Sequence, residues 1–209
     1  DATYVFDFAR NMSGVTRIKV SGEEGTVVRR KHGERIYDNG RVNMSNIDVY
    51  HRPVDDKDPF QTDILILSGK GEDEFMARFN YKGFRYVEVT SSKPVALDQN
   101  SLTAYFVHSD VPQKGEINTS NPLVNRLWWA TNNAYLSNLM GYPTDCPQRD
   151  ERLGWTGDAQ IFCETACWLA DTWTFYSKWL KDLAVDQLPD GGVANVVPNI
   201  EETHTEANW

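Results

Sequence analysis

One stretch of the sequence concentrates the side chains that could perform chemistry. Residues 142–158 read Tyr-Pro-Thr-Asp-Cys-Pro-Gln-Arg-Asp-Glu-Arg-Leu-Gly-Trp-Thr-Gly-Asp, with four carboxylates, two arginines and a tryptophan. Carboxyl groups can donate or accept protons, and both charge types can form charge-assisted hydrogen bonds to hydroxyl groups. Two prolines and two glycines suit neither an amphipathic helix nor a strand, so we expect an ordered loop.

The plainest interpretation of such a cluster is a solvated surface, whose ion pairs add little stability. Two features favour a site instead. The cluster is bracketed by Pro147 and Trp155, and it runs directly into a strongly apolar helical pattern. A solvated surface would not need these flanking residues or the adjoining apolar helix.

A metal-dependent hydrolase is another interpretation of the same acids. Four carboxylates could serve as oxygen ligands for magnesium, namely Asp145, Asp150, Glu151 and Asp158. Arg149 and Arg152 lie within the cluster and oppose a dication, and no His/Cys spacing resembles a zinc site. The acidic segment Val54–Pro59 lacks the glycine at the turn of familiar calcium loops. We therefore predict no metal and no other cofactor.

Short strands are predicted from the N-terminus to about residue 118. Polar and apolar residues alternate at Tyr4–Phe8 and Val15–Val20, and β-branched or aromatic runs follow at Thr62–Leu67 and Phe84–Val89. Turn signals separate such runs at Ser21-Gly22, Asp38-Asn39-Gly40, Ser68-Gly69 and Lys82-Gly83. This spacing predicts an all-β sandwich.

The hydrophobic period changes to that of helices after Ser120. Asn121 is a good N-cap and Pro122 a good first residue for a helix that reaches Gly141. A second helix is predicted from about Asp158 to Val185. Both patterns are apolar around much of the circumference, so we expect the helices to pack on the sandwich or on another copy of the chain, as a homo-oligomer.

The composition excludes several classes of protein. The chain has 209 residues, 40% of them hydrophobic, and a net charge of −9, which argues against nucleic-acid binding. Cys163 and Cys167 lie four apart on the second helix, where a bridge is disfavoured, so we expect free, mostly buried thiols. No segment approaches 18 consecutive apolar residues and Asp1–Thr3 does not begin a signal peptide, so we expect a soluble chain without membrane insertion.

The loop resembles the signature of the bacterial α-L-rhamnosidases, a family of inverting glycoside hydrolases. Fourteen consecutive positions, Asp145–Asp158, match that signature. Further matching segments extend over nearly the entire chain, at Val5–Phe8, Asn11–Gly14, Arg78–Val87, Val107–Asp110 and Asn121–Leu127.

The resemblance implies a multidomain β + α architecture. Residues 1–118 would form a β-sandwich, and residues 119–209 would be the N-terminal, truncated part of an (α/α)6-barrel catalytic domain. A twelve-helix barrel needs roughly 200 residues or more beyond the sandwich, so we expect a fragment of a longer enzyme. The resemblance implies that the partners are rhamnose-containing glycosides or oligosaccharides. It also implies a bacterial protein that is cytoplasmic, periplasmic or secreted.

The family motif also implies roles for individual residues. Glu151 matches the general acid, and the sugar-binding positions match Asp145, Arg149, Trp155 and Asp158. The general base of the family lies far downstream, beyond residue 209, so the acids Glu201, Glu202 and Glu206 are not assigned to it and this fragment alone is expected to be inactive. The alternative is a noncatalytic carbohydrate-binding module, which predicts exposed aromatic residues on the sandwich, with Tyr81, Phe84 and Tyr86 as candidates.

Overall fold

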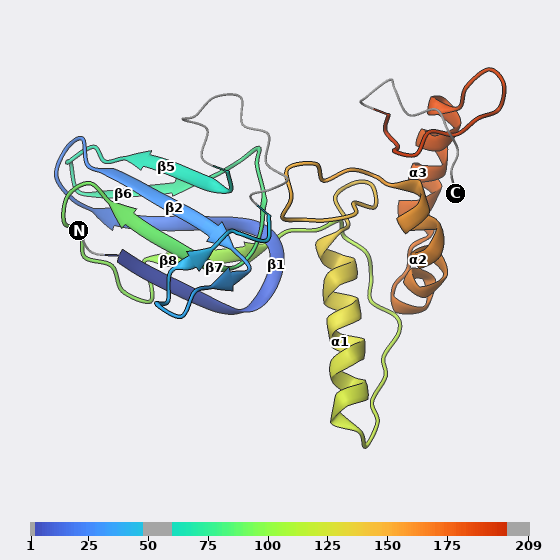
Figure 1. The fold of residues 1–209 in the computed structure, drawn as a ribbon, viewed down its shortest axis with the longest axis horizontal. Coiled ribbons are helices and arrows are strands. Elements are labelled where there is room, and N and C mark those ends of the chain that lie inside the picture. The colour runs from blue at the N-terminus through green and yellow to red at the C-terminus, as the bar shows by residue number, and fades with distance from the viewer. Residues whose placement is uncertain (1–2, 48–59, 200–209) are drawn as a thin grey trace. The chain divides into compact units, whose positions relative to one another are not determined.

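The computed structural model describes residues 3–47 and 60–199 (Figure 1). The acidic segment Val54–Pro59 and the glutamates Glu201, Glu202 and Glu206 therefore lie outside the described residues. The chain divides into two compact units. The β unit comprises residues 1–107 together with 147–151, and the helical unit comprises residues 108–146 and 152–209.

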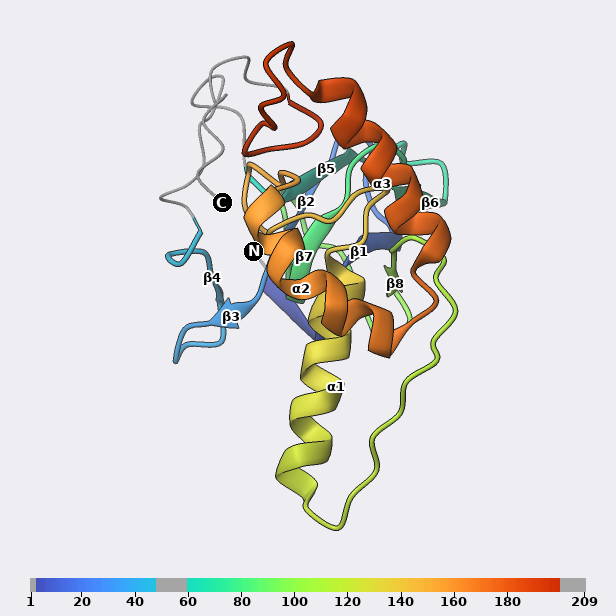
Figure 2. The ribbon, with the colours of Figure 1, turned by 90° about the vertical axis from the view of Figure 1, so that its right-hand side faces the viewer.

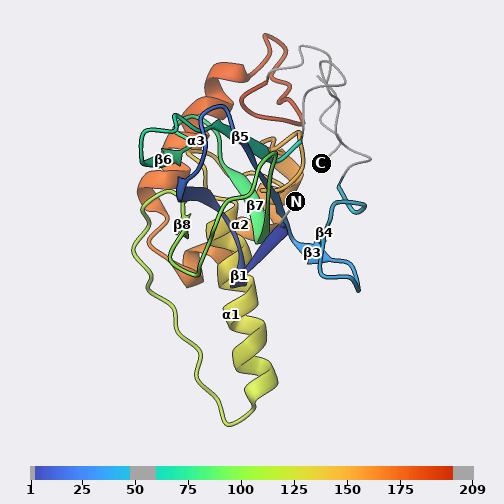
Figure 3. The same cartoon turned by 90° about the vertical axis from the view of Figure 1, so that its left-hand side faces the viewer.

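The β unit is built on one curled antiparallel sheet. Its described strands are β1 (Thr3–Ser21), β2 (Val27–Gly33), β5 (Thr62–Ile66), β6 (Glu72–Met76), β7 (Lys82–Ser91) and β8 (Leu102–Phe106). They are paired in the order β5-β2-β7-β1-β6, and β8 also pairs with β1. β3 (Arg35–Ile36) and β4 (Val42–Asn43) form a small ribbon beside the main sheet (Figure 3).

The long strand β1 explains how a single sheet forms a sandwich. Its N-terminal part pairs with β7, the register shifts between Asp7 and Met12, and its C-terminal part pairs with β8 and β6. The two predicted strands at Tyr4–Phe8 and Val15–Val20 are thus parts of one strand. The predicted β-sandwich is confirmed in this curled form.

Alternation along the strands places one set of side chains in the core. The buried cluster contains Met12, Ile18, Val20, Val28, Leu67, Phe84, Val87, Val89, Val95 and Leu102. Phe84 is fully buried, so it is not one of the exposed aromatic residues that the carbohydrate-binding alternative requires. The predicted turn at Lys82-Gly83 is wrong, because both residues belong to β7 and are buried.

Three helices follow in the described part of the helical unit, α1 (Pro122–Ser137), α2 (Thr156–Leu169) and α3 (Trp173–Asp186) (Figure 2). The predicted start of α1 is confirmed, because the Asn121 side chain accepts a hydrogen bond from the backbone N of Leu123 at 2.9 Å. The helix ends at Ser137, four residues before the predicted end at Gly141.

The single second helix predicted from Asp158 to Val185 is wrong, because the chain breaks it between α2 and α3. Ala170 has extended backbone angles and forms an isolated bridge with Gln113. The backbone N atoms of Lys114 and Gly115 both donate to the carbonyl O of Leu169 at 3.0 Å. The segment before α1 therefore supplies the hydrogen bonds that end α2.

The three cysteines are free, as predicted, but only Cys146 is buried. Cys163 is intermediate and Cys167 is exposed, so the prediction of mostly buried thiols is wrong for this pair. Both lie on α2, whose neighbours in the described structure leave part of its circumference uncovered. None of the described helices is both long and apolar enough to cross a membrane.

Candidate active site

The segment that carries the candidate residues is a loop, as predicted. It contains no helix or extended strand from Asn138 to Trp155, and α2 begins at Thr156. The loop is nevertheless ordered by hydrogen bonds. Within the helical unit, the backbone N and a carboxylate oxygen of Asp145 are both bonded to the backbone of Leu153, each at 2.9 Å.

This pairing gives Asp145 a structural role in the loop. Its backbone N donates to the Leu153 carbonyl O, and its carboxylate accepts from the Leu153 backbone N. The bonds close a loop of seven residues, 146–152. One lone pair of the Asp145 carboxylate is therefore committed to the protein, whatever else this side chain binds.

The middle of this loop, Pro147–Glu151, belongs to the β unit. Arg149 Nη1 donates to Glu151 Oε1 at 3.1 Å, and each side chain is about one third exposed, at 35% and 32%. Glu151 is thus held by a charge-assisted hydrogen bond while its side chain stays partly exposed. Asp150, between them in sequence, is exposed.

The end of the motif is fixed against a second segment of the helical unit. The carbonyl O of Val197 would lie only 2.1 Å from a Cβ at Gly154, and Gly154 and Val197 are also joined by a backbone hydrogen bond of 2.9 Å. Trp155 forms an isolated bridge with Val196 and is partly buried. This tight approach explains why a glycine precedes the tryptophan.

Asp158 stands in the first turn of α2 and is exposed. There its charge is favourable to the helix dipole, which is a structural reason for an acid at this position. Asp158 also lines a hollow of about 530 Å³ within the helical unit. Aromatic side chains from all three helices contribute to the same hollow, namely Tyr135, Phe162 and Tyr176.

The structure thus distributes the five predicted site residues over its two units. Arg149 and Glu151 are in direct contact in the β unit. Asp145, Trp155 and Asp158 belong to the helical unit, and only Asp158 lines its hollow.

Sequence reasoning missed the residue that supports the loop from the sheet. Gly83, at the start of β7, lies against Gln148 of the motif within the β unit. A signal was present, because a glycine inside a strand pattern often marks a close backbone approach. The Lys82-Gly83 dipeptide instead suggests a turn, which the structure does not contain.

Comparison with known proteins assigns both parts of the chain. Residues 1–108 match the bacterial alpha-L-rhamnosidase concanavalin-like domain, and residues 112–209 match the bacterial alpha-L-rhamnosidase 6 hairpin glycosidase domain.

Similar sequences include an alpha-L-rhamnosidase from Streptomyces avermitilis, 36% identical over 94% of this chain and 18% of that protein. Another, from Alteromonas sp., is 33% identical over 99% of this chain and 22% of that protein. The chain therefore spans about a fifth of the length of these relatives.

Solved structures give the same result. The alpha-L-rhamnosidase named for Dictyoglumus thermophilum has a TM-score of 0.84 and 39% identity, covering 94% of this chain and 21% of that one. The Streptomyces avermitilis enzyme, solved in complex with L-rhamnose, has a TM-score of 0.85 and 36% identity, covering 97% and 19%. Since the two domain models account for nearly all of its residues, this chain belongs to the bacterial α-L-rhamnosidase family.

Proposed function

We propose that this chain is part of an inverting α-L-rhamnosidase, which hydrolyses terminal α-L-rhamnosyl residues of glycosides, and that Glu151 is its general acid. The observation that carries the proposal is the loop Asp145–Asp158. It matches the family signature throughout, and it presents a partly exposed Glu151 side chain bonded to Arg149. A proton donor needs access to the substrate.

Inverting hydrolysis divides the chemistry between two carboxyl groups. Glu151 would protonate the leaving oxygen, while a second carboxylate, roughly 6.5 to 9.5 Å away, activates water on the opposite face of the sugar. In this proposal the second carboxylate lies outside the 209 residues, so this chain alone lacks enzymatic turnover.

The remaining motif residues are proposed to bind the sugar. Asp145, Arg149 and Asp158 would form charge-assisted hydrogen bonds with its hydroxyl groups, and Trp155 would offer an apolar face to the ring and its methyl group. The L-rhamnose complex of the Streptomyces avermitilis relative supports a rhamnosyl substrate.

The test of the acid uses Glu151→Gln in the longer protein that contains this chain. The amide keeps the hydrogen-bonding shape but cannot donate the proton, and general acid catalysis is typically worth about 10²- to 10⁴-fold. We expect the loss in kcat/KM to be large for a natural rhamnoside, whose alkoxide leaves poorly. It should be much smaller for a nitrophenyl rhamnoside, which departs almost unaided. The alkaline limb of the pH profile should flatten.

Asp158→Asn is the matched control, since it also neutralises a motif carboxylate. A binding residue stabilises substrate and transition state alike, so both substrates should lose activity by similar factors. Equal losses for both substrates in Glu151→Gln, with an unchanged alkaline limb, would assign Glu151 to binding or structure. Asp150 or Asp145 would then be the next candidate for the acid.

A further inference from the structure

A glycine in the sheet lies close against the motif. A Cβ placed on Gly83 would lie 2.7 Å from each of three atoms of Gln148, the backbone N, Cα and Cβ. Two of those atoms are backbone, so no side-chain rotation can relieve the overlap. Gly83 does not have a positive φ, so glycine is required here for space and not for backbone conformation. Both residues belong to the β unit.

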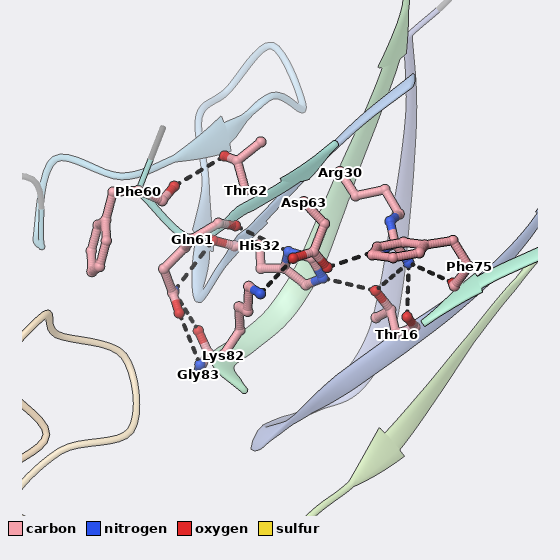
Figure 4. Close-up of polar contacts among 10 residues, drawn as sticks. All are labelled: Thr16, Arg30, His32, Phe60, Gln61, Thr62, Asp63, Phe75, Lys82 and Gly83. Atoms are coloured by element: carbon pink, nitrogen blue, oxygen red, sulfur yellow. Dashed lines mark hydrogen bonds and ion pairs between the residues drawn. The ribbon is translucent and has the colours of Figure 1, made fainter. Parts of the chain in front are cut away.

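Gly83 itself is held by the side chain of Gln61 (Figure 4). Its backbone N donates to Gln61 Oε1 at 3.0 Å, and its carbonyl O accepts from Gln61 Nε2 at 2.9 Å. The amide group therefore takes the place of a neighbouring strand, beyond the point where β2 ends at Gly33. Gln61 is only 4% exposed, so this two-bond clamp is shielded from water.

The clamp is fixed in turn by a buried polar network. The carbonyl O of Gln61 accepts hydrogen bonds from both the backbone N and Nδ1 of His32, each at 3.0 Å. Two cations bind the nearby Asp63. Arg30 Nη2 lies 3.2 Å from Asp63 Oδ2, and Lys82 Nζ lies 2.5 Å from Asp63 Oδ1. Figure 4 shows this network linking β2, β5 and β7, with Thr16 of β1 bonded to both Arg30 and His32. Arg30 Nε is buried without a hydrogen-bond partner among the described residues, but the other bonds of the network restrict the positions of Gln61, His32 and Asp63.

The chain from this anchor to the proposed acid is short. Gln148 is three residues before Glu151, and consecutive Cα atoms are about 3.8 Å apart, so a shift of Gln148 has few bonds over which to relax. Arg149, the next residue, donates the hydrogen bond that orients Glu151. A displacement of Gln148 would therefore reach both members of that pair.

We propose that Gly83, locked by the Gln61 amide, is a positioning residue that sets the location of the Glu151 carboxyl group, so that the β unit takes part in the acid step. This inference rests on the proposed function of Glu151. It gives the sheet a role in catalysis without any contact to the substrate.

The test is Gly83→Ala in the longer protein. An ordinary contact of 3.4 Å or more requires the two segments to move apart by several tenths of an ångström. Misplacement on this scale lowers rates by roughly 10- to 100-fold. We expect that loss in kcat for a natural rhamnoside, a smaller loss for a nitrophenyl rhamnoside, and little change in KM. The alkaline limb of the pH profile should shift or flatten as in Glu151→Gln.

Gly33→Ala is the matched control within the same sheet. Its Cβ would meet side chains of the β3–β4 region, Val42 Cγ1 at 2.5 Å and Met44 Sδ at 3.1 Å, and not the motif. Gly33→Ala should lower the unfolding temperature but keep the parental ratio of the kcat values for the two substrates. If Gly83→Ala and Gly33→Ala had the same ratio of activities on the natural and nitrophenyl rhamnosides, Gly83 would be important for folding only.

Gln61→Met provides a second approach that does not crowd the loop. Methionine has a side chain of similar length but no amide group, so both bonds to Gly83 are lost and the clamp weakens. We expect the ratio of activities on the two substrates to shift in the same direction as in Gly83→Ala, and faster amide exchange in residues 148–151. A parental ratio and parental exchange in Gln61→Met would overturn the inference, also in the case that Gly83→Ala fails to fold.

The Glu151→Gln variant separates the two proposals. Suppose that Glu151→Gln lowers the activity more for the natural rhamnoside than for the nitrophenyl rhamnoside, while the Gly83 and Gln61 variants lower both equally. In that case only the positioning inference fails. If Glu151→Gln does not discriminate either, the proposed role of Glu151 fails and the inference falls with it.

Discussion

At the scale of single residues, His32 makes the β unit sensitive to acid. It is fully buried, and burial lowers the pKa of the imidazole from 6.5 to about 3. Its Nδ1 must carry the proton, because its partner there is the Gln61 carbonyl O, which can only accept. Nε2 is then free to accept from the Thr16 hydroxyl at 2.8 Å. The histidine is therefore neutral in the folded protein.

The pKa of His32 differs between the folded and the unfolded chain, and this difference makes the stability depend on pH. The unfolded chain binds a proton at His32 below pH 6.5 and the folded chain does not, so the free energy of unfolding should fall as the pH drops from 6.5 toward 3. One group contributes up to about 1.4 kcal/mol per pH unit. Urea unfolding of the β unit between pH 6.5 and 4.5 measures the slope, and His32→Gln should reduce it. An identical slope in the variant would show that other groups titrate instead.

The pH range from 6.5 to 4.5 separates the titration of His32 from that of the buried carboxylate Glu88. Burial alone would raise the pKa of Glu88, but hydrogen bonds from the Arg41 side chain and the Val42 backbone N outweigh it, with help from Lys31, and lower it to about 2. Its ordinary value is 4.5, so stability from Glu88 is lost only as the pH falls below 4.5 toward 2.

At the scale of elements, the end of α2 depends on Gly115. A Cβ at this position would lie 2.1 Å from the carbonyl O of Trp168 and 3.3 Å from Cα of Leu169. Gly115→Ala should therefore push away the segment that ends α2, and we expect a loss of about 2 kcal/mol in the stability of the helical unit. Denaturant unfolding followed by far-UV circular dichroism checks this.

Lys114→Ala is the neighbouring control. It removes an exposed ion pair with Asp171, and such pairs contribute little to stability. A stability of Gly115→Ala equal to that of Lys114→Ala would show that the segment before α1 does not determine where α2 ends.

At the scale of the whole molecule, the helices leave much apolar surface uncovered. Large apolar side chains are more than 60% exposed at Leu123, Leu127, Ile161, Trp168, Trp173, Leu180 and Val185. Surfaces of this kind associate with other surfaces in water. We predict that the 209-residue chain self-associates as its concentration rises, which sedimentation velocity measures.

Exposed and buried positions on α3 give matched variants for this prediction. Trp173→Gln should weaken association and keep the fold, because Trp173 is 80% exposed. Phe175→Gln should destabilise the helical unit, because Phe175 is 7% exposed. A monodisperse monomer at all concentrations would contradict the prediction.

Local sequence patterns were enough to predict several features of this protein. Alternation along β1 and β7 predicted the strands, and Asn121 with Pro122 predicted the start of α1, since capping involves residues within one turn. The irregular composition of residues 142–158 predicted the loop. The family signature in the same residues predicted the family, which the domain matches confirm.

Features that depend on residues far apart in sequence became evident from the three-dimensional fold. Hydrogen bonds from Lys114 and Gly115 end the helix after Leu169. The hydrophobic periodicity within the helix therefore does not predict this break. The requirement for glycine at position 83 arises from Gln148, 65 positions later. Local signals are properties of a segment, whereas helix ends and close backbone approaches also depend on whichever segment the fold brings alongside.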